Sequence, residues 1–152
     1  MKFIADTMLG RLSRYLRAAG HNVLYYRNIE DADLIARAQQ EERIILTRDT
    51  RIASRKICQA KQPACIVLES QDYRKQLQQL KRTIGLTLSA EFCRCIRCNQ
   101  CLEKVSKQDF KPRIPPYVYR NHNRFWYCRQ CDKLYWRGTH CSSMEKVLAS
   151  IS

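Results

Sequence analysis

Arg43-Ile44-Ile45-Leu46-Thr47-Arg48-Asp49 decides the fold, because a continuous apolar run ends there abruptly in polar residues. A short apolar run of this kind is typical of a strand that is buried on both faces of a sheet. Similar runs at residues 3–5, 23–26 and 66–68 predict three more strands. Between the runs lie stretches with apolar residues at helical spacing. Strands that alternate with helices along residues 1–88 predict an α/β fold, a parallel sheet flanked by helices.

The expected helices begin after each strand and end at recognisable residues. Gly20 and Gly85 stand where a helix C-terminus favours glycine. Composition then changes near residue 89, where long apolar runs stop and cysteines and aromatic residues begin. Arg113 to Pro116 predicts an extended connection, because proline disfavours a continuing helix. We therefore predict two domains, residues 1–88 and residues 89–152. The expected helices are residues 9–19, 31–38, 50–60 and 73–84.

Nine cysteines are present, and most of them follow residue 92. Charged residues interrupt the N-terminal segment, so a secretory signal is not expected and the predicted location is the cytoplasm. No apolar run reaches the ~18 residues of a spanning helix, so no membrane partner is expected. An odd number of cysteines in such a chain argues against a disulfide framework. Cys58 and Cys65 stand apart from the others and are expected to be small, buried apolar residues.

Two C-x-x-C pairs, separated by 29 residues, predict a zinc ribbon. The first pair can be Cys95 with Cys98, or Cys98 with Cys101. The residue after the second cysteine of such a pair usually adopts a positive φ, which Asn99 tolerates and Leu102 does not. Four thiolates would make a closed, structural site, whereas thiol redox chemistry is the alternative. The predicted zinc ligands are Cys95, Cys98, Cys128 and Cys131, the last of which precedes Asp132.

Three aspartates follow the predicted elements at points where a site can form. Asp6 follows the first strand, Asp49 follows the third, and Asp31 stands at the start of the second helix. Because the carboxyl ends of parallel strands gather at one edge of the sheet, we predict that the three carboxylates hold Mg²⁺ or Mn²⁺ there. Asp33 competes with Asp31 for this role. Each residue could instead serve only as a helix N-cap or an ion-pair partner.

The net charge of +14 predicts a nucleic-acid partner. Arg11 and Arg14, with Arg17 at the same spacing of three, are expected to form either a phosphate-binding stripe or a solvated helix face. Thr47 and Arg48 lie beside Asp49, where they could orient a carboxylate or contact phosphate. The ribbon is rich in aromatic residues and arginines, a combination typical of binding to unpaired bases. The predicted substrate-binding residues are Arg11, Arg14, Thr47, Arg48 and Arg137.

Several motifs together resemble the Mut7-C RNase domain family, which is similar to PIN-domain nucleases. They are Phe3-Ile4-Ala5-Asp6, Met8-Leu9-Gly10-Arg11-Leu12, the 43–49 stretch, Arg94-Cys95-Ile96-Arg97-Cys98-Asn99 and Tyr135-Trp136-Arg137-Gly138-Thr139-His140. The resemblance covers nearly the whole chain and implies a PIN-like sheet fused to a zinc ribbon. It also implies metal-dependent ribonuclease activity, with the acidic pattern of the family on Asp6, Asp31 and Asp49. Asn22 departs from the family, which often has aspartate at that position.

Together these observations predict a metal-dependent ribonuclease whose N-terminal domain cuts RNA while the ribbon binds or positions it. Two other functions fit the same sequence. One is a non-catalytic RNA-binding module with a degenerate acidic site, and the other is the toxin of a toxin–antitoxin pair.

Overall fold

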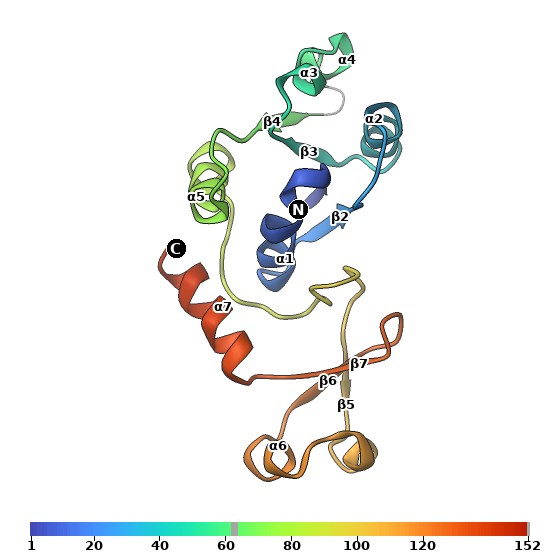
Figure 1. The fold of residues 1–152 in the computed structure, drawn as a ribbon, viewed down its shortest axis with the longest axis vertical. Coiled ribbons are helices and arrows are strands. Elements are labelled where there is room, and N and C mark those ends of the chain that lie inside the picture. The colour runs from blue at the N-terminus through green and yellow to red at the C-terminus, as the bar shows by residue number, and fades with distance from the viewer. Residues whose placement is uncertain (62–63, 152) are drawn as a thin grey trace.

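A computed structural model describes residues 1–61 and 64–151. The first part of the chain forms a parallel four-stranded sheet with the strand order β2-β1-β3-β4 (Figure 1). The strands are β1 (Lys2–Ala5), β2 (Asn22–Tyr25), β3 (Ile44–Thr47) and β4 (Cys65–Val67). The alternation of strands and helices predicted from the sequence is therefore confirmed.

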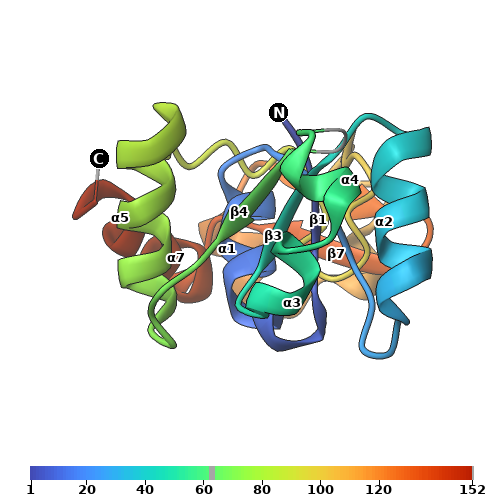
Figure 2. The same ribbon diagram turned by 90° about the horizontal axis from the view of Figure 1, so that it is seen from above.

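Helices cover both faces of this sheet. On one face lie α1 (Gly10–Ala18) and α5 (Tyr73–Ile84), and on the other lie α2 (Asp31–Gln40), α3 (Thr50–Ala53) and α4 (Lys56–Gln59) (Figure 2). Because side chains alternate along a strand, Phe3 and Ala5 pack under α1 while Ile4 packs under α2. Gly20 and Gly85 end their helices with positive φ, as expected.

The predicted helix over residues 50–60 is wrong, because two short helices replace it. Ser54 ends α3, and its hydroxyl donates a hydrogen bond of 2.9 Å to the carbonyl oxygen of Arg51. Arg55 then adopts an extended conformation and precedes α4. A serine side chain that bonds the neighbouring main chain competes with the helical pattern, which explains the break.

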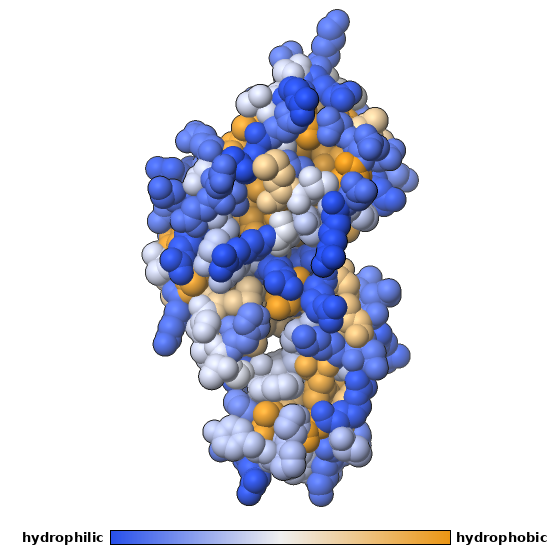
Figure 3. Space-filling model, viewed as in Figure 1, coloured by the Kyte–Doolittle hydropathy of each residue, from blue (hydrophilic) through white to orange (hydrophobic). Residues whose placement is uncertain are grey.

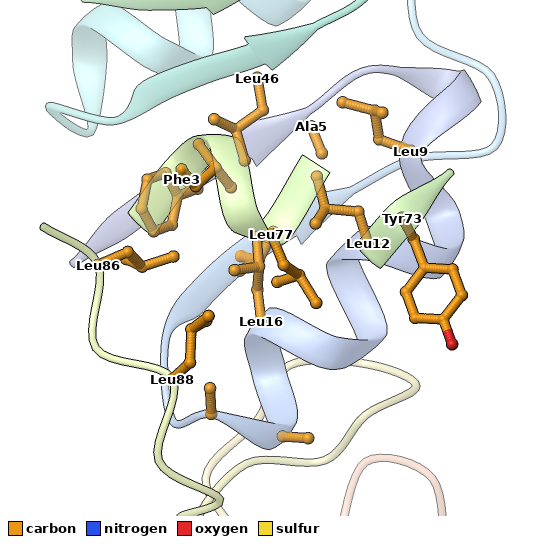
Figure 4. Close-up of a cluster of buried hydrophobic side chains, with 14 of the residues drawn as sticks. Phe3, Ala5, Leu9, Leu12, Leu16, Leu46, Tyr73, Leu77, Leu86 and Leu88 are labelled. Atoms are coloured by element: carbon orange, nitrogen blue, oxygen red, sulfur yellow. The ribbon is translucent and has the colours of Figure 1, made fainter. Parts of the chain in front are cut away.

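The face under α1 and α5 holds the larger core (Figure 4). Leu12, Leu16 and Leu77 are fully buried there. The last helix, α7 (Thr139–Ala149), returns to this core from the far end of the chain and adds Met144 and Leu148. The core of the first 88 residues is thus completed by the C-terminal segment.

The ribbon consists of three antiparallel strands, β5 (Glu103–Val105), β6 (Phe125–Cys128) and β7 (Lys133–Trp136). A 3₁₀ turn (η2, Lys111–Arg113) and α6 (Pro116–Asn121) connect β5 to β6. The predicted extended connection is correct at Ile114 and Pro115 but wrong at Arg113, which ends η2, and at Pro116, which begins α6. Proline is compatible with the first position of a helix, where its missing N–H is not needed. Among the described helices, none has the length and apolar character needed to cross a membrane.

Candidate metal centre and acidic strand-end site

Four cysteines converge where the loop before β5 meets the β6–β7 hairpin. The sulfur atoms of Cys95, Cys98, Cys128 and Cys131 all lie within 4.8 Å of one another. The Sγ–Sγ distances are 3.8 Å between Cys95 and Cys131 and 3.4 Å between Cys98 and Cys128. Tetrahedral zinc with Zn–S bonds of about 2.3 Å places sulfur atoms roughly 3.8 Å apart. These four cysteines could therefore hold a zinc ion.

The structure places Cys95 and Cys98, and not Cys101, beside Cys128 and Cys131. Asn99 has a φ of 74° and Asp132 a φ of 47°, as the turn geometry predicted. Cys101 is exposed and lies outside the cluster, in a β-bridge with Arg94. Cys58 is buried, as predicted for a small apolar residue, and Cys65 is partly buried.

The surroundings of Cys95 favour the thiolate form that metals bind. Burial alone raises the pKa of this thiol, but hydrogen bonds from the Tyr135 hydroxyl and from the main-chain N–H groups of Cys98 and Arg97 lower the pKa to about 7. The Tyr135 hydroxyl lies 3.1 Å from the Cys95 sulfur. Sequence reasoning missed this role for Tyr135, because it depends on how β7 is placed against the first C-x-x-C loop.

The first C-x-x-C loop is fastened to the edge strand β2. Asn99 accepts a hydrogen bond of 2.9 Å from the main-chain N–H of Val23, and it donates one of 2.8 Å to the Asn22 side chain. From the other direction, the buried guanidinium of Arg17 donates to the carbonyl oxygens of Val23, Ile96 and Arg97. These side chains occupy polar groups that an edge strand would otherwise leave open. Arg17 therefore does not belong to an exposed phosphate-binding stripe.

The acidic residues lie at the carboxyl edge of the parallel sheet. The connection from β1 to β2 runs through α1 on one face, whereas the connection from β2 to β3 runs through α2 on the other. The ends of β1 and β3 consequently form a topological switch point, the place where open α/β sheets generally bind ligands. Asp6 directly follows β1, and Asp49 lies two residues after β3.

Asp6 is a buried carboxylate with three donors. It caps the 3₁₀ turn η1 (Thr7–Leu9) by accepting from the N–H of Met8 at 2.9 Å. Its other oxygen accepts from the Thr47 hydroxyl and from the main-chain N–H of Arg48. A carboxylate offers about four acceptor sites, so one site remains on the oxygen that Met8 contacts.

Asp49 is linked to Asp6 through Thr47. The fully buried Thr47 hydroxyl donates to Asp6 and accepts a hydrogen bond of 2.9 Å from the Asp49 N–H. The carboxylate of Asp49 caps α3 and pairs with Arg51 at 2.7 Å. Hydrogen bonds from Arg51 hold the pKa of Asp49 below its usual value. The side chain of Arg51 is 87% exposed, so it can move away from Asp49 at little cost.

Asp31 is the first residue of α2, after Glu30 at the N-cap, and it pairs with Arg55 at 3.5 Å. Asp33 is exposed on the same helix. Within residues 1–61 and 64–151, the cysteine cluster is the one group of three or more potential ligands whose donor atoms all lie within 4.8 Å. Asp6, Asp31 and Asp49 do not form such a group in this conformation.

The predicted substrate-binding residues lie in two regions. Arg11 and Arg14 are exposed on α1, where the Arg11 guanidinium lies 4.4 Å from the centre of the Tyr73 ring. Arg48 is partly buried, and its Nε has no hydrogen-bond partner among the described residues. Arg137 lies apart from them, after β7, with its guanidinium 5.9 Å from the centre of the Phe92 ring.

Thr47→Val should lower the free energy of unfolding by about 2 kcal/mol, because it keeps the shape of the side chain but removes a hydrogen bond to a buried carboxylate. Urea unfolding of the variant beside the wild type measures this loss. Thr83→Val, an exposed change on α5, is the matched control. Equal stability of the two variants would show that the bond between Thr47 and Asp6 contributes nothing.

The comparisons with known proteins agree with these features. The family model described as Mut7-C RNAse domain matches residues 1–148. No curated protein and no solved structure matches the chain.

Proposed function

Since the chain belongs to the Mut7-C RNAse domain family, we propose that it is a metal-dependent ribonuclease that hydrolyses RNA phosphodiester bonds. Residues 1–88 would form the cutting domain, with a PIN-like sheet, and residues 89–152 a zinc ribbon that positions RNA. The observation that carries the proposal is the pair of carboxylates, Asp6 and Asp49, which Thr47 joins at the switch point of the sheet.

The donor set at this edge suits a hard divalent ion. Mg²⁺ usually keeps several waters and takes only one or two carboxylates, together with phosphate oxygens of the substrate. Asp6 has an acceptor site left, and the carboxylate of Asp49 is hydrogen-bonded, among the described residues, only to Arg51, whose side chain is exposed. Asp31 would bind the ion through a water molecule, because its carboxylate does not form a close group with those of Asp6 and Asp49. Bound there, Mg²⁺ or Mn²⁺ would lower the pKa of a water and offset the charge that develops on the phosphate.

The protein's own residues supply position and charge. The buried Thr47 hydroxyl and the Arg48 N–H hold the Asp6 carboxylate in one orientation. Arg48 and Arg51 lie next to Asp49, where their guanidinium groups could bind phosphate oxygens once RNA is present. An arginine that leaves Asp49 for a phosphate would free the carboxylate as the substrate enters.

Asp49→Asn tests the proposal and should abolish cleavage while RNA affinity stays equal or rises. Asparagine is also a good N-cap, and an exposed ion pair contributes little to stability, so the variant should stay folded. Labelled single-stranded RNA is incubated with Mn²⁺, Mg²⁺ or EDTA and wild-type protein or the variant. Asp132→Asn removes another arginine-paired aspartate, outside the strand-end site, and should leave cleavage unchanged.

One result would overturn the proposed site, and another would overturn the nuclease itself. Cleavage by Asp49→Asn at the wild-type rate would remove Asp49 from the site. Tight, salt-sensitive RNA binding by both proteins with no cleavage under any metal would instead favour a non-catalytic RNA-binding module, in which Arg51 closes Asp49 permanently.

A further inference from the structure

Two adjoining hollows run along the side of the molecule from α1 to the ribbon. The first lies between Arg11 and Arg14 on α1, Tyr25 and Arg27 at the end of β2, and Arg97 in the first C-x-x-C loop. The second begins at Arg14 and Arg97 and continues past Lys133, Tyr135 and Trp136 to His140. Because Arg14, Ile96 and Arg97 line both hollows, they form one continuous groove. We call it the α1–ribbon groove.

The α1–ribbon groove carries a single sign of charge. Among the residues that the structure describes, no aspartate or glutamate lines either hollow. Five cations line them with exposed side chains, and none forms an ion pair within the part of the chain that the structure describes; these are Arg11, Arg14, Arg27, Arg97 and Lys133. In Figure 3, strongly hydrophilic side chains gather across the middle of the face, near the position of α1 in Figure 1. Unpaired cations along a concave surface attract a polyanion and release its counterions on binding.

One end of the groove lies at the same edge of the sheet as the acidic residues. Tyr25, which lines the groove, pairs with Ala5 in the sheet, and Asp6 is the next residue. The Tyr25 hydroxyl also donates a hydrogen bond of 3.1 Å to the carbonyl oxygen of Thr7. From this point the groove follows α1 past Arg11 and Arg14 toward Arg17, which is about 10 Å of helix. The groove thus begins at the carboxyl edge of the sheet, one strand away from Asp6, and ends at β7 and the start of α7.

The groove also offers flat aromatic surfaces beside its cations. Tyr25 lies near one end, and Tyr135 and Trp136 lie near the other. A row of cations with aromatic rings at both ends suits a single strand, whose bases are free to stack, better than a duplex, whose bases are enclosed. Ile96 and Arg97, which line the groove, are held in place by Arg17, because its buried guanidinium donates hydrogen bonds to their carbonyl oxygens.

We propose that the α1–ribbon groove holds the backbone of single-stranded RNA, with phosphates on Arg14, Arg97 and Lys133, and delivers it to the strand-end acids. This inference rests on the proposed nuclease function and names the path of its substrate. It also adds Arg27, Arg97 and Lys133 to the binding residues predicted from the sequence. The ribbon then contributes through the same continuous surface as α1 rather than as a separate binding site.

The test is the salt dependence of binding. Fluorescence anisotropy of a labelled oligouridylate is measured over a range of salt concentrations, with the zinc-loaded full chain and no added Mg²⁺ or Mn²⁺. Each phosphate contact to a single strand contributes about 0.7 to the slope of log affinity against log salt. Arg14→Gln combined with Arg97→Gln should therefore reduce the slope by about 1.4. Arg14→Lys combined with Arg97→Lys should keep the wild-type slope, because both charges remain.

Arg82→Gln is the matched control, an exposed arginine on α5 that lines neither hollow. A zinc assay and urea unfolding confirm that the groove variants are folded. The proposed RNA path would be overturned if the salt slope of the double glutamine variant equalled that of Arg82→Gln. Tighter binding to duplex RNA than to the single strand would also overturn it. These outcomes differ from a failure of the nuclease, which shows in the cleavage assay as no metal-dependent cleavage by the wild type, and not in the salt dependence of binding.

Discussion

Cys128→Ser is expected to release zinc and to unfold the ribbon. The apparent binding free energy of structural zinc in small domains is about 10–16 kcal/mol at neutral pH, and that energy stabilises the fold. The ribbon has little else to hold it, because its own cluster of fully or nearly buried apolar side chains contains only Ile114, Phe125 and Leu134. Zinc content per chain and amide exchange of β6 measure the two effects.

The control for this experiment lies in the same loop. Cys101→Ser changes an exposed thiol outside the cluster, so zinc content and exchange should match the wild type. Cys95→Ser should behave like Cys128→Ser. If Cys101→Ser lost zinc while Cys95→Ser kept it, Cys98 and Cys101 would be the ligand pair and our assignment of Cys95 and Cys98 would be wrong.

Arg17→Leu is expected to lower the free energy of unfolding by about 3 kcal/mol. The substitution keeps an apolar side chain on α1 but removes the hydrogen bonds that Arg17 donates to the carbonyl oxygens of Val23, Ile96 and Arg97. Each hydrogen bond to a charged or buried group contributes about 1 kcal/mol or more, and the stranded carbonyls add a desolvation cost. Urea unfolding, followed by fluorescence and by amide exchange at the Val23 N–H, measures the loss.

Arg14→Leu is the matched control, one helical turn earlier and exposed. Surface changes of this kind usually alter stability by less than about 0.5 kcal/mol. Similar unfolding curves for the two variants would show that Arg17 does not fasten the C-x-x-C loop to the sheet.

The sequence was most informative where local chemistry decides the structure. Apolar runs bounded by polar residues located the four strands to within a residue or two. The choice of Cys95 and Cys98 depended on the backbone preference of Asn99, a property of one residue that the fold leaves unchanged. Likewise, Asp6 and Asp49 were expected at the carboxyl edge because chain order and parallel pairing bring strand ends together.

What escaped prediction depends on contacts between distant segments. Arg11, Arg14 and Arg17 are equally spaced in the sequence, yet only the docking of the C-x-x-C loop buries Arg17. The break between α3 and α4 depends on where the Ser54 hydroxyl finds a partner. The pairing of Asp49 with Arg51 could be proposed from the sequence, but only the structure shows that Asp6, Asp31 and Asp49 do not form a close cluster within the described residues.

The packing of α7 against α1 and α5 has a consequence for how the protein is made. Residues 1–88 leave the ribosome before Met144 and Leu148 are synthesised, so the core under α1 and α5 first forms without the side chains that α7 adds. The segment with the four clustered cysteines must be synthesised before α7 can complete this core. With zinc bound at these cysteines, as we propose, metal supply during translation should affect how much of the newly synthesised protein escapes aggregation.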